Sequence, residues 1–467
     1  MILLAHSYFL RDDAKQFARM KPYPPLATLL SAAVLRGQGH EVALFDAMLA
    51  DGMGDFRAML AATDPSVVAI VEDTFNYITK MCTVRLREAT LEMIAAARAR
   101  GCRVLVNGSD ATDHPGRYLD AGADAVVLGE GEATLADAAA VLRADARASL
   151  ADVAGLALHD AEGALTMTAP RAGARDLDAL PLPAWDLVDA EAYRRAWQRA
   201  HGRLSWNMVT SRGCPYGCNW CAKPVFGRRY AQRSAASVAE EMHRLKRDIR
   251  PGHVWFADDI FGLTARWIGD FATELRARDA SIPFMIQCRA DLVTPPVARA
   301  LAQAGCEEVW MGVESGSQRI LDAMDKGTTI TEVRAATSAL KSNRIRACWF
   351  LQLGYPGEQW EDVLATRDIV RELRPDDVGV SVAYPLPGTK FHAAVQQQLG
   401  AQHNWEETGD LAMLFQGTYT TAFYRRIRDA LHAETSDGVD EDLWFSLGDE
   451  EPEHRTLRPT AITDAAR

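Results

Sequence analysis

The chain has 467 residues, of which 48% are hydrophobic and 24% charged, and its formal net charge is −12. This length suits two or three domains with ample cores, and the acidic balance argues against sequence-independent binding of nucleic acid. We see no apolar run of the roughly 18–20 residues that a membrane span needs and no signal-peptide pattern, so we expect a cytoplasmic protein with reduced cysteines and no membrane partner.

Residues 1–150 alternate apolar runs with helical stretches. The apolar runs are ILLAHS, EVALFDA, VVAIVE, RVLVNGS and AVVLGE. Near-continuous apolar strands separated by helices are typical of a parallel sheet covered on both faces. We therefore predict a doubly wound, Rossmann-like α/β domain whose ligand lies beyond the carboxyl ends of the strands. A dinucleotide is disfavoured because no G-x-G-x-x-G follows the first strand.

The rest of the chain divides into three parts. Residues 151–200 predict a linker with a hairpin closed at Ala161-Glu162-Gly163. Residues 201–395 contain six further apolar runs separated by helical patterns, one of them with a capping box at Ser237 and Glu240. This alternation predicts a partial (β/α)6 barrel of the TIM type, with its chemistry at the strand carboxyl ends. Residues 396–467 predict a small helical region with an acidic tail whose end is loosely ordered.

Three of the eight cysteines, Cys214, Cys218 and Cys221, lie within eight residues, directly after the predicted strand WNMVTSRG. A closed zinc site needs four ligands, and no further histidine or cysteine follows closely. A cubane 4Fe-4S cluster has four iron corners, so three thiolates leave one iron open to a small molecule. The pattern therefore favours an iron–sulfur cluster with a vacant coordination position.

The spacing C-x3-C-x2-C, with Trp220 before the last cysteine, resembles the radical S-adenosylmethionine (SAM) superfamily over roughly residues 205–390. The resemblance implies that SAM chelates the open iron and is cleaved to a 5′-deoxyadenosyl radical by an electron from a flavodoxin- or ferredoxin-type donor. It also implies SAM contacts at strand ends and in the cysteine loop, namely Trp220, Asp258, Asp259, Arg289, Glu314 and Gly354.

The first 150 residues resemble the cobalamin-binding domain of cobalamin-dependent radical SAM enzymes, above all in KPYPPLATLLSAAVLRGQGHEVALFDA and VVLGEGEATL. The histidine motif D-x-H-x-x-G is absent, so the resemblance implies a weak lower cobalt ligand or none from protein. We interpret Glu72 and Asp73, after the third strand, as solvated loop residues, and a relic domain without cofactor is the alternative. The implied cobalamin contacts are Thr74, Asn107, Gly108, Gly129, Glu130, Gly131 and Glu132.

These resemblances imply a methyltransferase that uses methylcobalamin and the radical to methylate an unactivated carbon of a small molecule. Three alternatives differ in class. The first is an anaerobic Mg-protoporphyrin IX monomethyl ester cyclase, which has the same layout. The second is a tRNA methylthiolase, which would need an N-terminal cysteine set that is missing here. The third is a cobalamin or SAM sensor, which would not be catalytic. Weak candidates for further catalytic residues are Tyr355, Tyr384 and Cys348.

Overall fold

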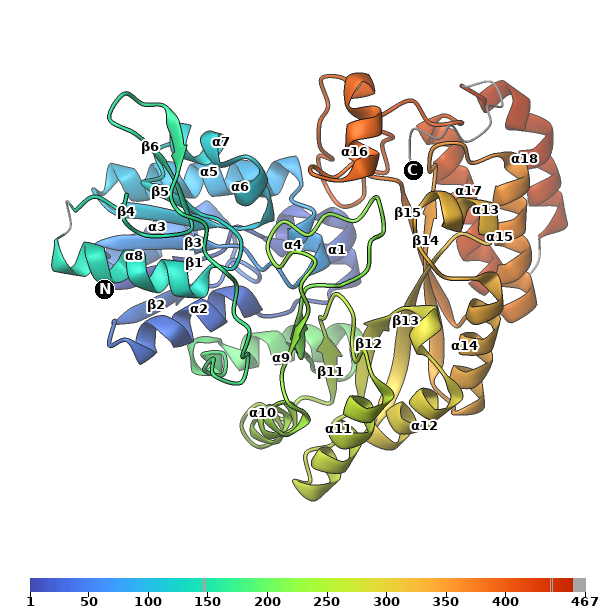
Figure 1. The fold of residues 1–467 in the computed structure, drawn as a ribbon, viewed down its shortest axis with the longest axis horizontal. Coiled ribbons are helices and arrows are strands. Elements are labelled where there is room, and N and C mark those ends of the chain that lie inside the picture. Colours follow the sequence, from blue (N-terminus) through green and yellow to red (C-terminus); the bar gives the residue numbers. More distant parts are fainter. Residues whose placement is uncertain (146–147, 437, 439, 457–467) are drawn as a thin grey trace.

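Figure 1 shows the fold of a computed structural model, which describes residues 1–145, 148–436, 438 and 440–456. Two α/β bodies lie side by side, and the helices at the end of the chain cover the outer flank of the second body. One hydrophobic core runs from the first body into the second, so the two bodies are joined by side-chain packing and not only by the connecting chain. None of the helices in these ranges is long and apolar enough to cross a membrane.

The first body contains a seven-stranded sheet with the order β2-β1-β3-β4-β5-β6-β7. Its strands are β1 (Ile2–Ala5), β2 (Val42–Phe45), β3 (Val67–Val71), β4 (Arg103–Asn107), β5 (Ala125–Val127), β6 (Leu156–His159) and β7 (Leu165–Met167). β1 to β5 pair in parallel, which confirms the predicted doubly wound fold. β6 and β7 form the predicted hairpin, and because β6 pairs with β5 the hairpin extends this sheet.

Helices cover both faces of this sheet because its strands are apolar on both faces. Ile2 and Leu4 share a core with α2 (Leu26–Gly37) and α8 (Glu132–Ala144). Leu3 and Ala5 face the opposite way, toward α3 (Met53–Thr63), α5 (Val84–Ala99) and α7 (Pro115–Asp120). Three short helices complete the body: α1 (Ala14–Arg19), α4 (Tyr77–Lys80) and α6 (Ser109–Asp113).

The second body is a six-stranded parallel sheet with the order β15-β14-β13-β12-β11-β8. Its strands are β8 (Ser205–Met208), β11 (His253–Phe256), β12 (Phe284–Cys288), β13 (Cys306–Glu314), β14 (Arg346–Leu353) and β15 (Asp377–Val382). The helices between them are α10 (Ala235–Asp248), α11 (Ala265–Ala277), α12 (Pro295–Ala304), α13 (Gln318–Ala323), α14 (Ile330–Ser342) and α15 (Trp360–Leu373). The six predicted strands are confirmed, and β8 and β15 form the two edges of an incomplete barrel.

The connector and the end of the chain pack onto these bodies. α9 (Ala190–His201) lies between them, since Trp197 Nε1 donates to Pro22 O at 2.6 Å while Tyr193 packs on Trp206 of β8. After α16 (Lys390–Val395), α17 (Thr421–Ser436) packs on β15 and α15, and α18 (Glu441–His454) follows. The predicted helical region is thus present, whereas the predicted loose end falls on residues 457–467, outside the described residues.

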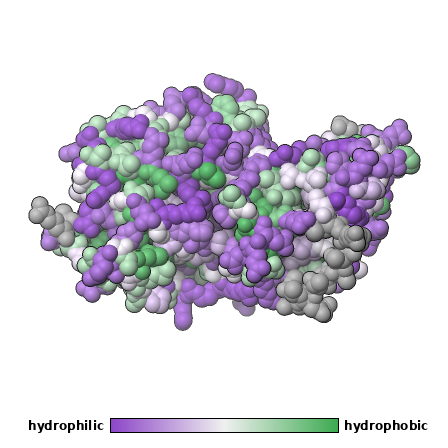
Figure 2. Space-filling view, turned by 90° about the horizontal axis from the view of Figure 1, so that it is seen from above, coloured by the Kyte–Doolittle hydropathy of each residue, from purple (hydrophilic) through white to green (hydrophobic). Residues whose placement is uncertain are grey.

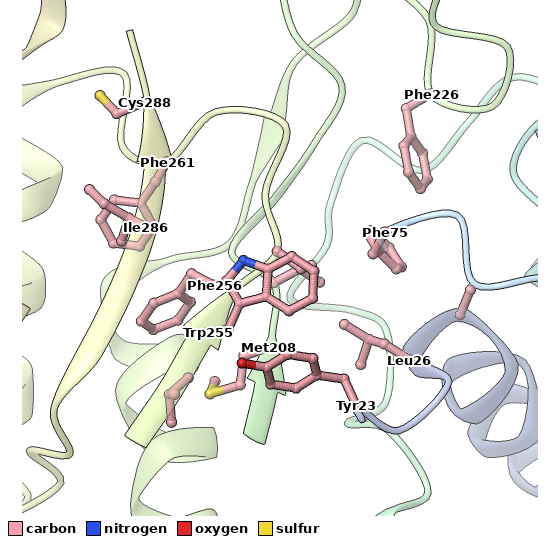
Figure 3. Close-up of a cluster of buried hydrophobic side chains, with 14 of the residues drawn as sticks. Tyr23, Leu26, Phe75, Met208, Phe226, Trp255, Phe256, Phe261, Ile286 and Cys288 are labelled. Carbon is pink, nitrogen blue, oxygen red and sulfur yellow. The ribbon is translucent and has the colours of Figure 1, made fainter. Parts of the chain in front are cut away.

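The carboxyl-terminal sides of the two bodies meet across an apolar interface. Figure 3 shows Tyr23 and Phe75 of the first body facing Trp255 and Phe226 of the second. The ring centroids of Tyr23 and Trp255 are 4.8 Å apart, and those of Phe75 and Phe226 are 5.0 Å apart. Seen from above, apolar side chains also surface toward the middle of the molecule, among polar ones (Figure 2).

Candidate functional site

The three clustered cysteines lie on a loop that a small antiparallel ladder closes. β9 (Ser211–Arg212) and β10 (Ala231–Gln232) pair with each other, and the loop between them carries Cys214, Cys218 and Cys221. All three thiols are free and half-buried, whereas the other five cysteines are buried. Because β9 follows β8 closely, the loop lies at the carboxyl edge of the barrel, where the sequence predicted it.

Two of the three thiols have raised pKa values. Within the described ranges no three histidine, cysteine or acidic side chains lie close enough together to hold one metal ion. Burial raises the pKa of Cys221 to about 11 and also raises the pKa of Cys214. Iron binding would therefore displace protons from these thiols.

Cations surround the thiols. Lys223 interacts electrostatically with Cys214 and Cys221, and Lys80 of the first body does so with Cys221. Burial acts to lower the pKa of Lys326, but Glu314 and Cys218 outweigh it and raise this pKa. Arg289 Nη1 lies 3.9 Å from Cys218 Sγ. An anionic cluster would fit this environment, since each thiolate would gain a nearby positive charge.

Asn219, between two of the cysteines, anchors the loop to the barrel through its backbone and its side chain. Its backbone N–H donates to Met324 O at 3.0 Å, and its carbonyl accepts from Phe391 N at 3.1 Å. Its Nδ2 donates to Ala323 O at 2.7 Å, and its Oδ1 accepts from Tyr355 OH at 2.8 Å. These bonds fix the middle of the cysteine loop although it has no regular secondary structure.

Arg289 lies close to Cys218, whereas Glu314 pairs with Lys326, whose ammonium also interacts with Cys218, and both side chains are held in place. Arg289 donates to both carboxylate oxygens of Asp291, at 2.9 and 3.2 Å, and lies over the ring of Tyr216, 3.8 Å from its centroid. Glu314, with a left-handed φ of 65°, accepts from Lys326 Nζ at 2.7 Å. The predicted SAM contacts of these strand ends are therefore brought to the thiols, and part of their bonding capacity is already used.

The two adjacent aspartates after β11 have different surroundings. Asp258 is buried and accepts from Thr210 N–H at 3.0 Å and from the hydroxyls of Thr210 and Ser211. Burial raises its pKa to about 7 despite these bonds. Asp259 is more open, with a side chain that is 26% exposed, and forms an ion pair with Lys80 of the first body. Asp258 thus holds the strand that leads into the cysteine loop, while Asp259 faces the interface.

Gly354 and Trp220 complete the predicted SAM set. Gly354 follows β14 with φ 78°, and a Cβ there would lie 2.9 Å from Met413 Cε, so the segment before α17 closes over it. Its N–H donates to Glu358 Oε2 at 2.7 Å. Trp220 packs at the edge of a small apolar cluster, and its buried Nε1 has no partner among the described atoms. This unpaired donor fits a site that a polar ligand completes.

The predicted cobalamin contacts gather at the carboxyl ends of β3, β4 and β5. Asn107 ends β4, and its Nδ2 donates to Val127 O at 2.9 Å and to Gly129 O at 3.1 Å. The positions brought together at this edge are Thr74, Asn107, Gly108, Gly129, Glu130, Gly131 and Glu132. Glu130 and Glu132, however, turn their carboxylates toward Arg212 of the second body.

The interpretation of Glu72 and Asp73 as solvated loop residues is wrong. They are 8% and 2% exposed, because the segment after β3 folds under the helices of the same edge. Burial raises the pKa of Asp73 to about 6 and also raises that of Glu72. Glu72 Oε2 and Ser109 Oγ are buried without a partner in the described part of the chain. Unpaired polar atoms at this edge fit a polar ligand such as a corrin with its amide side chains.

The weak catalytic candidates lie in three different places. Tyr355 OH donates to Asn219 and to Ala323 O, so it supports the cysteine loop. Tyr384 OH donates to Asn404 of the C-terminal segment, and its ring packs on Trp405. Cys348 is fully buried near the amino end of β14, beside Arg346 and Glu308, and therefore lies away from the cysteine loop.

Sequence reasoning missed several residues of the site. Lys80, Lys326 and Arg212 contact it through ion pairs with Asp259, Glu314 and the two glutamates. Lys80 and Lys326 are far from any motif in sequence, so only the fold identifies them. Arg212 precedes the cysteines by two residues and Asn219 stands between two of them, and this closeness to the motif was the available signal.

Comparison with known proteins matches both bodies to families. The radical SAM superfamily model matches residues 208–370, and the B12 binding domain model matches residues 20–139. An uncharacterized methyltransferase of Pyrococcus horikoshii is 28% identical over 389 residues, covering 82% of this chain and 81% of the relative. The hopanoid C-3 methylase of Methylococcus capsulatus is 27% identical, covering 82% and 70%. An anaerobic magnesium-protoporphyrin IX monomethyl ester cyclase of Rubrivivax gelatinosus is 26% identical, covering 56% and 47%.

The solved structures agree on the fold. The radical SAM methyltransferase TsrM from Kitasatospora setae, with cobalamin and a 4Fe-4S cluster bound, superimposes with a TM-score of 0.69 at 21% identity. The match covers 86% of this chain and 75% of TsrM. Along the chain, a region that matches the B12 binding domain thus precedes one that matches the radical SAM superfamily. The cysteine loop belongs to the second region and packs against the first through Phe226 and Phe75.

Proposed function

We propose that this protein is a methyltransferase that acts on an unactivated carbon of a small-molecule substrate. One observation carries the proposal: the three-thiol loop lies where the carboxyl edge of the barrel meets that of the B12 binding domain, with Lys80 of one domain paired to Asp259 of the other. Methylase names among the relatives support it. When bound, a cluster with SAM supplies radical chemistry and cobalamin supplies methyl transfer.

In this proposal Cys214, Cys218 and Cys221 hold the cluster, and the surrounding strand ends bind SAM. Asp259 suits the SAM amino group, because its carboxylate is the accessible one of the aspartate pair. Arg289 lies beside Cys218, and Glu314 pairs with Lys326, which interacts with Cys218. Arg289 and Glu314 would meet the SAM carboxylate and ribose, while Gly354 and Trp220 would border the adenine. Asp258 acts indirectly, through Thr210 and Ser211.

Cobalamin would lie against the carboxyl ends of β3 to β5. Thr74, Gly108, Gly129 and Gly131 would approach it with backbone groups, while Asn107 holds the turn after β5. The segment that follows β3, residues 72–76, contains no histidine that could ligate cobalt. A weakly ligated cobalt favours methyl transfer, which agrees with the proposed reaction.

The experiment is anaerobic reconstitution with iron and sulfide, followed by SAM, a reductant and cobalamin, with small products identified by mass spectrometry. Methyl transfer predicts 5′-deoxyadenosine together with S-adenosylhomocysteine. The cyclase alternative, favoured by the Rubrivivax gelatinosus relative, predicts 5′-deoxyadenosine alone, and a sensor predicts neither. Cys218→Ala should abolish 5′-deoxyadenosine formation, whereas Cys306→Ala, a buried cysteine distant from the loop, should keep it.

We further propose a cytoplasmic location and a flavodoxin- or ferredoxin-type electron donor. All eight cysteines are free, which suits a reducing compartment. Arg228 and Arg229 are exposed on the cysteine loop, and Arg228 Nη1 would lie 4.0 Å from a Cβ at Gly217, next to Cys218. The exposed guanidinium of Arg228 near the thiols of an acidic chain suits an acidic electron carrier, whereas that of Arg229 turns toward Glu130 and Gly173.

A further inference from the structure

The G-E-G-E motif after β5, residues 129–132, contacts the loop that carries the three cysteines. Its two glutamates both accept hydrogen bonds from Arg212, which lies two residues before Cys214. We infer that Glu130, Glu132 and Arg212, here called the Arg212 network, fix the position of the cysteine loop against the B12 binding domain. This inference deepens the proposed function, since it names the residues that hold the two cofactor sites together.

The contacts are numerous and buried. Arg212 Nη2 donates to Glu132 Oε1 at 2.6 Å, and Nη1 donates to Glu132 Oε2 at 3.2 Å and to Glu130 Oε2 at 3.1 Å. The side chains of Arg212, Glu130 and Glu132 are 4%, 11% and 11% exposed. One guanidinium fork thus bridges two carboxylates with little competition from water, which makes the geometry specific as well as strong.

Aromatic rings shield this network. Phe75 of the first body stacks on Phe226 of the cysteine loop, and Figure 3 shows the two rings facing each other. The Arg212 guanidinium carbon lies 5.8 Å from the centroid of Phe75 and 5.6 Å from that of Phe226. Cation–π attraction adds to the ion pairs, and the rings keep the local dielectric low.

The rest of the motif is also occupied by protein contacts. Gly129, with φ 68°, would place a Cβ 3.4 Å from Val225 O of the cysteine loop, and a Cβ at Gly131 would lie 2.6 Å from Asn107 Oδ1. Glu130 Oε2 also accepts from Ala174 N–H at 2.8 Å. The glutamate carboxylates are therefore already bonded to groups of the protein. The backbone of the motif is the part that a cofactor would contact.

The position of Arg212 explains how the network acts on the cluster. Arg212 pairs with Ala231 in the β9–β10 ladder, so it belongs to the two-strand base on which the cysteine loop stands. A displacement of Arg212 would move both ends of that loop. Arg212 is therefore a positioning residue.

The test compares the double variant Glu130→Gln/Glu132→Gln with Glu434→Gln. Glu434 is a matched control because its side chain is 2% exposed and forms an ion pair with Arg371, which joins α17 to α15 on the outer flank of the barrel. Three quantities are measured: amide hydrogen exchange over residues 213–230 in cluster-free protein, the midpoint potential of the rebuilt cluster, and the dissociation constant for cobalamin.

We expect exchange in the loop to accelerate by about tenfold or more in the double variant only. The midpoint potential should become more positive, because Arg212 loses its counter-charges and stabilises the reduced cluster. The dissociation constant for cobalamin should stay within about twofold. Arg212→Lys keeps the positive charge but loses the bidentate geometry of the guanidinium, so it should accelerate exchange in the loop with little change of midpoint potential. This variant replaces the double variant in the test if the double variant does not fold.

Two results would overturn the inference. Cobalamin affinity that falls about tenfold while loop exchange is unchanged would show that the glutamates hold the corrin. Equal acceleration in Glu434→Gln would show a general loss of stability. The exchange measurement needs neither cofactor nor turnover, so it stands even if the protein proves not to cleave SAM, in which case only the proposed function fails.

Discussion

At the scale of single residues, Asp258 illustrates how a carboxyl at a strand end can be engaged by hydrogen bonds within the chain. Its side chain accepts from Thr210 and Ser211, the two residues that lead from β8 into the cysteine loop. Burial nevertheless dominates and raises its pKa from 3.8 to about 7. A carboxyl whose pKa is higher in the folded state than in the unfolded state stabilises the fold when it is protonated.

The sign of the pH effect follows from linkage. The stabilising contribution of protonated Asp258 is complete below pH about 4 and is lost as the pH rises toward 7. A shift of about three pKa units corresponds to roughly 4 kcal/mol at most. Asp258→Asn removes this titration, so we expect the wild-type chain to lose unfolding free energy relative to the variant between pH 4 and 7.

Urea unfolding of the cluster-free protein at several pH values measures this difference. Asp279→Asn is the surface control, since its side chain is 94% exposed. A difference between wild type and Asp258→Asn that stays constant from pH 4 to 7 would contradict the assignment.

The aspartate pair also shows what a sequence can and cannot specify about a site. The run FADDIFG placed both carboxylates at a strand end, which is correct. Adjacent residues in an extended segment point in opposite directions, but the sequence does not say which one faces the protein. Only the fold shows that Asp258 turns to Thr210 and that Asp259 meets Lys80.

At the scale of elements, the cysteine loop depends on its anchor to the barrel. Tyr355→Phe removes the hydroxyl that donates to Asn219 and Ala323 O, at a cost of about 1 kcal/mol. Asn219→Ala removes the side-chain bonds and leaves their partners unsatisfied, so its effect should be larger. We expect both variants to retain less iron than wild type after reconstitution and desalting, and Asn219→Ala to retain less than Tyr355→Phe.

Iron per chain and the cluster absorbance measure this retention. Tyr384→Phe is the matched control, because its hydroxyl bonds to Asn404 of the C-terminal segment. If Tyr384→Phe lost as much iron as Asn219→Ala, the loss would reflect general destabilisation and the anchor would have no special role.

The turn after β14 depends on a glycine. At Gly354 φ is 78°, and an added Cβ would lie 2.9 Å from Met413 Cε. Gly354→Ala should therefore lower the free energy of unfolding by roughly 1–3 kcal/mol. In a Met413→Ala background the same change should cost less, because the clash is relieved while the backbone cost remains. Thermal unfolding of the four proteins measures the coupling, and purely additive costs would contradict the contact.

The elements themselves were predicted well because their patterns are local. Apolar runs with β-branched residues predicted the strands of both sheets, and β1 to β5 and the six barrel strands pair in parallel, as expected. The capping box at Ser237 and Glu240 is wrong, since α10 begins after Ser234, whose side chain accepts from Ser237 N–H. The run Ser234-Ala235-Ala236-Ser237 offers two serines as possible caps, and packing of Ala235 and Val238 selects the earlier start.

At the scale of the whole molecule, contacts between the domains carry no local pattern. Lys80 and Asp259 are 179 residues apart, and Arg212 and Glu132 are 80 apart. The sequence predicted two cofactor edges that meet, but it assigned the glutamates to the corrin and did not identify Lys80. Such long-range ion pairs depend on how two separately patterned sheets dock, which residue periodicity does not encode.

The exposed arginines of the cysteine loop make a prediction about electron transfer. The chain carries a net charge of −12, so it would repel an acidic carrier except where cations gather. Arg228 is exposed beside Gly217 and Cys218, whereas Arg299 is exposed on α12, away from the loop. We expect Arg228→Glu to slow reduction by flavodoxin several-fold at low salt, and Arg299→Glu to have little effect.

A small chemical reductant separates docking from damage to the cluster. Because such a molecule needs no complementary surface, it should reduce the Arg228→Glu protein at the wild-type rate. The advantage of wild type over the variant should also shrink as ionic strength rises and the Debye length falls from about 10 Å at 0.1 M to about 3 Å at 1 M. Equal slowing with both reductants, or a loss independent of salt, would place the effect of Arg228 on the cluster itself and remove the argument for a docking surface here.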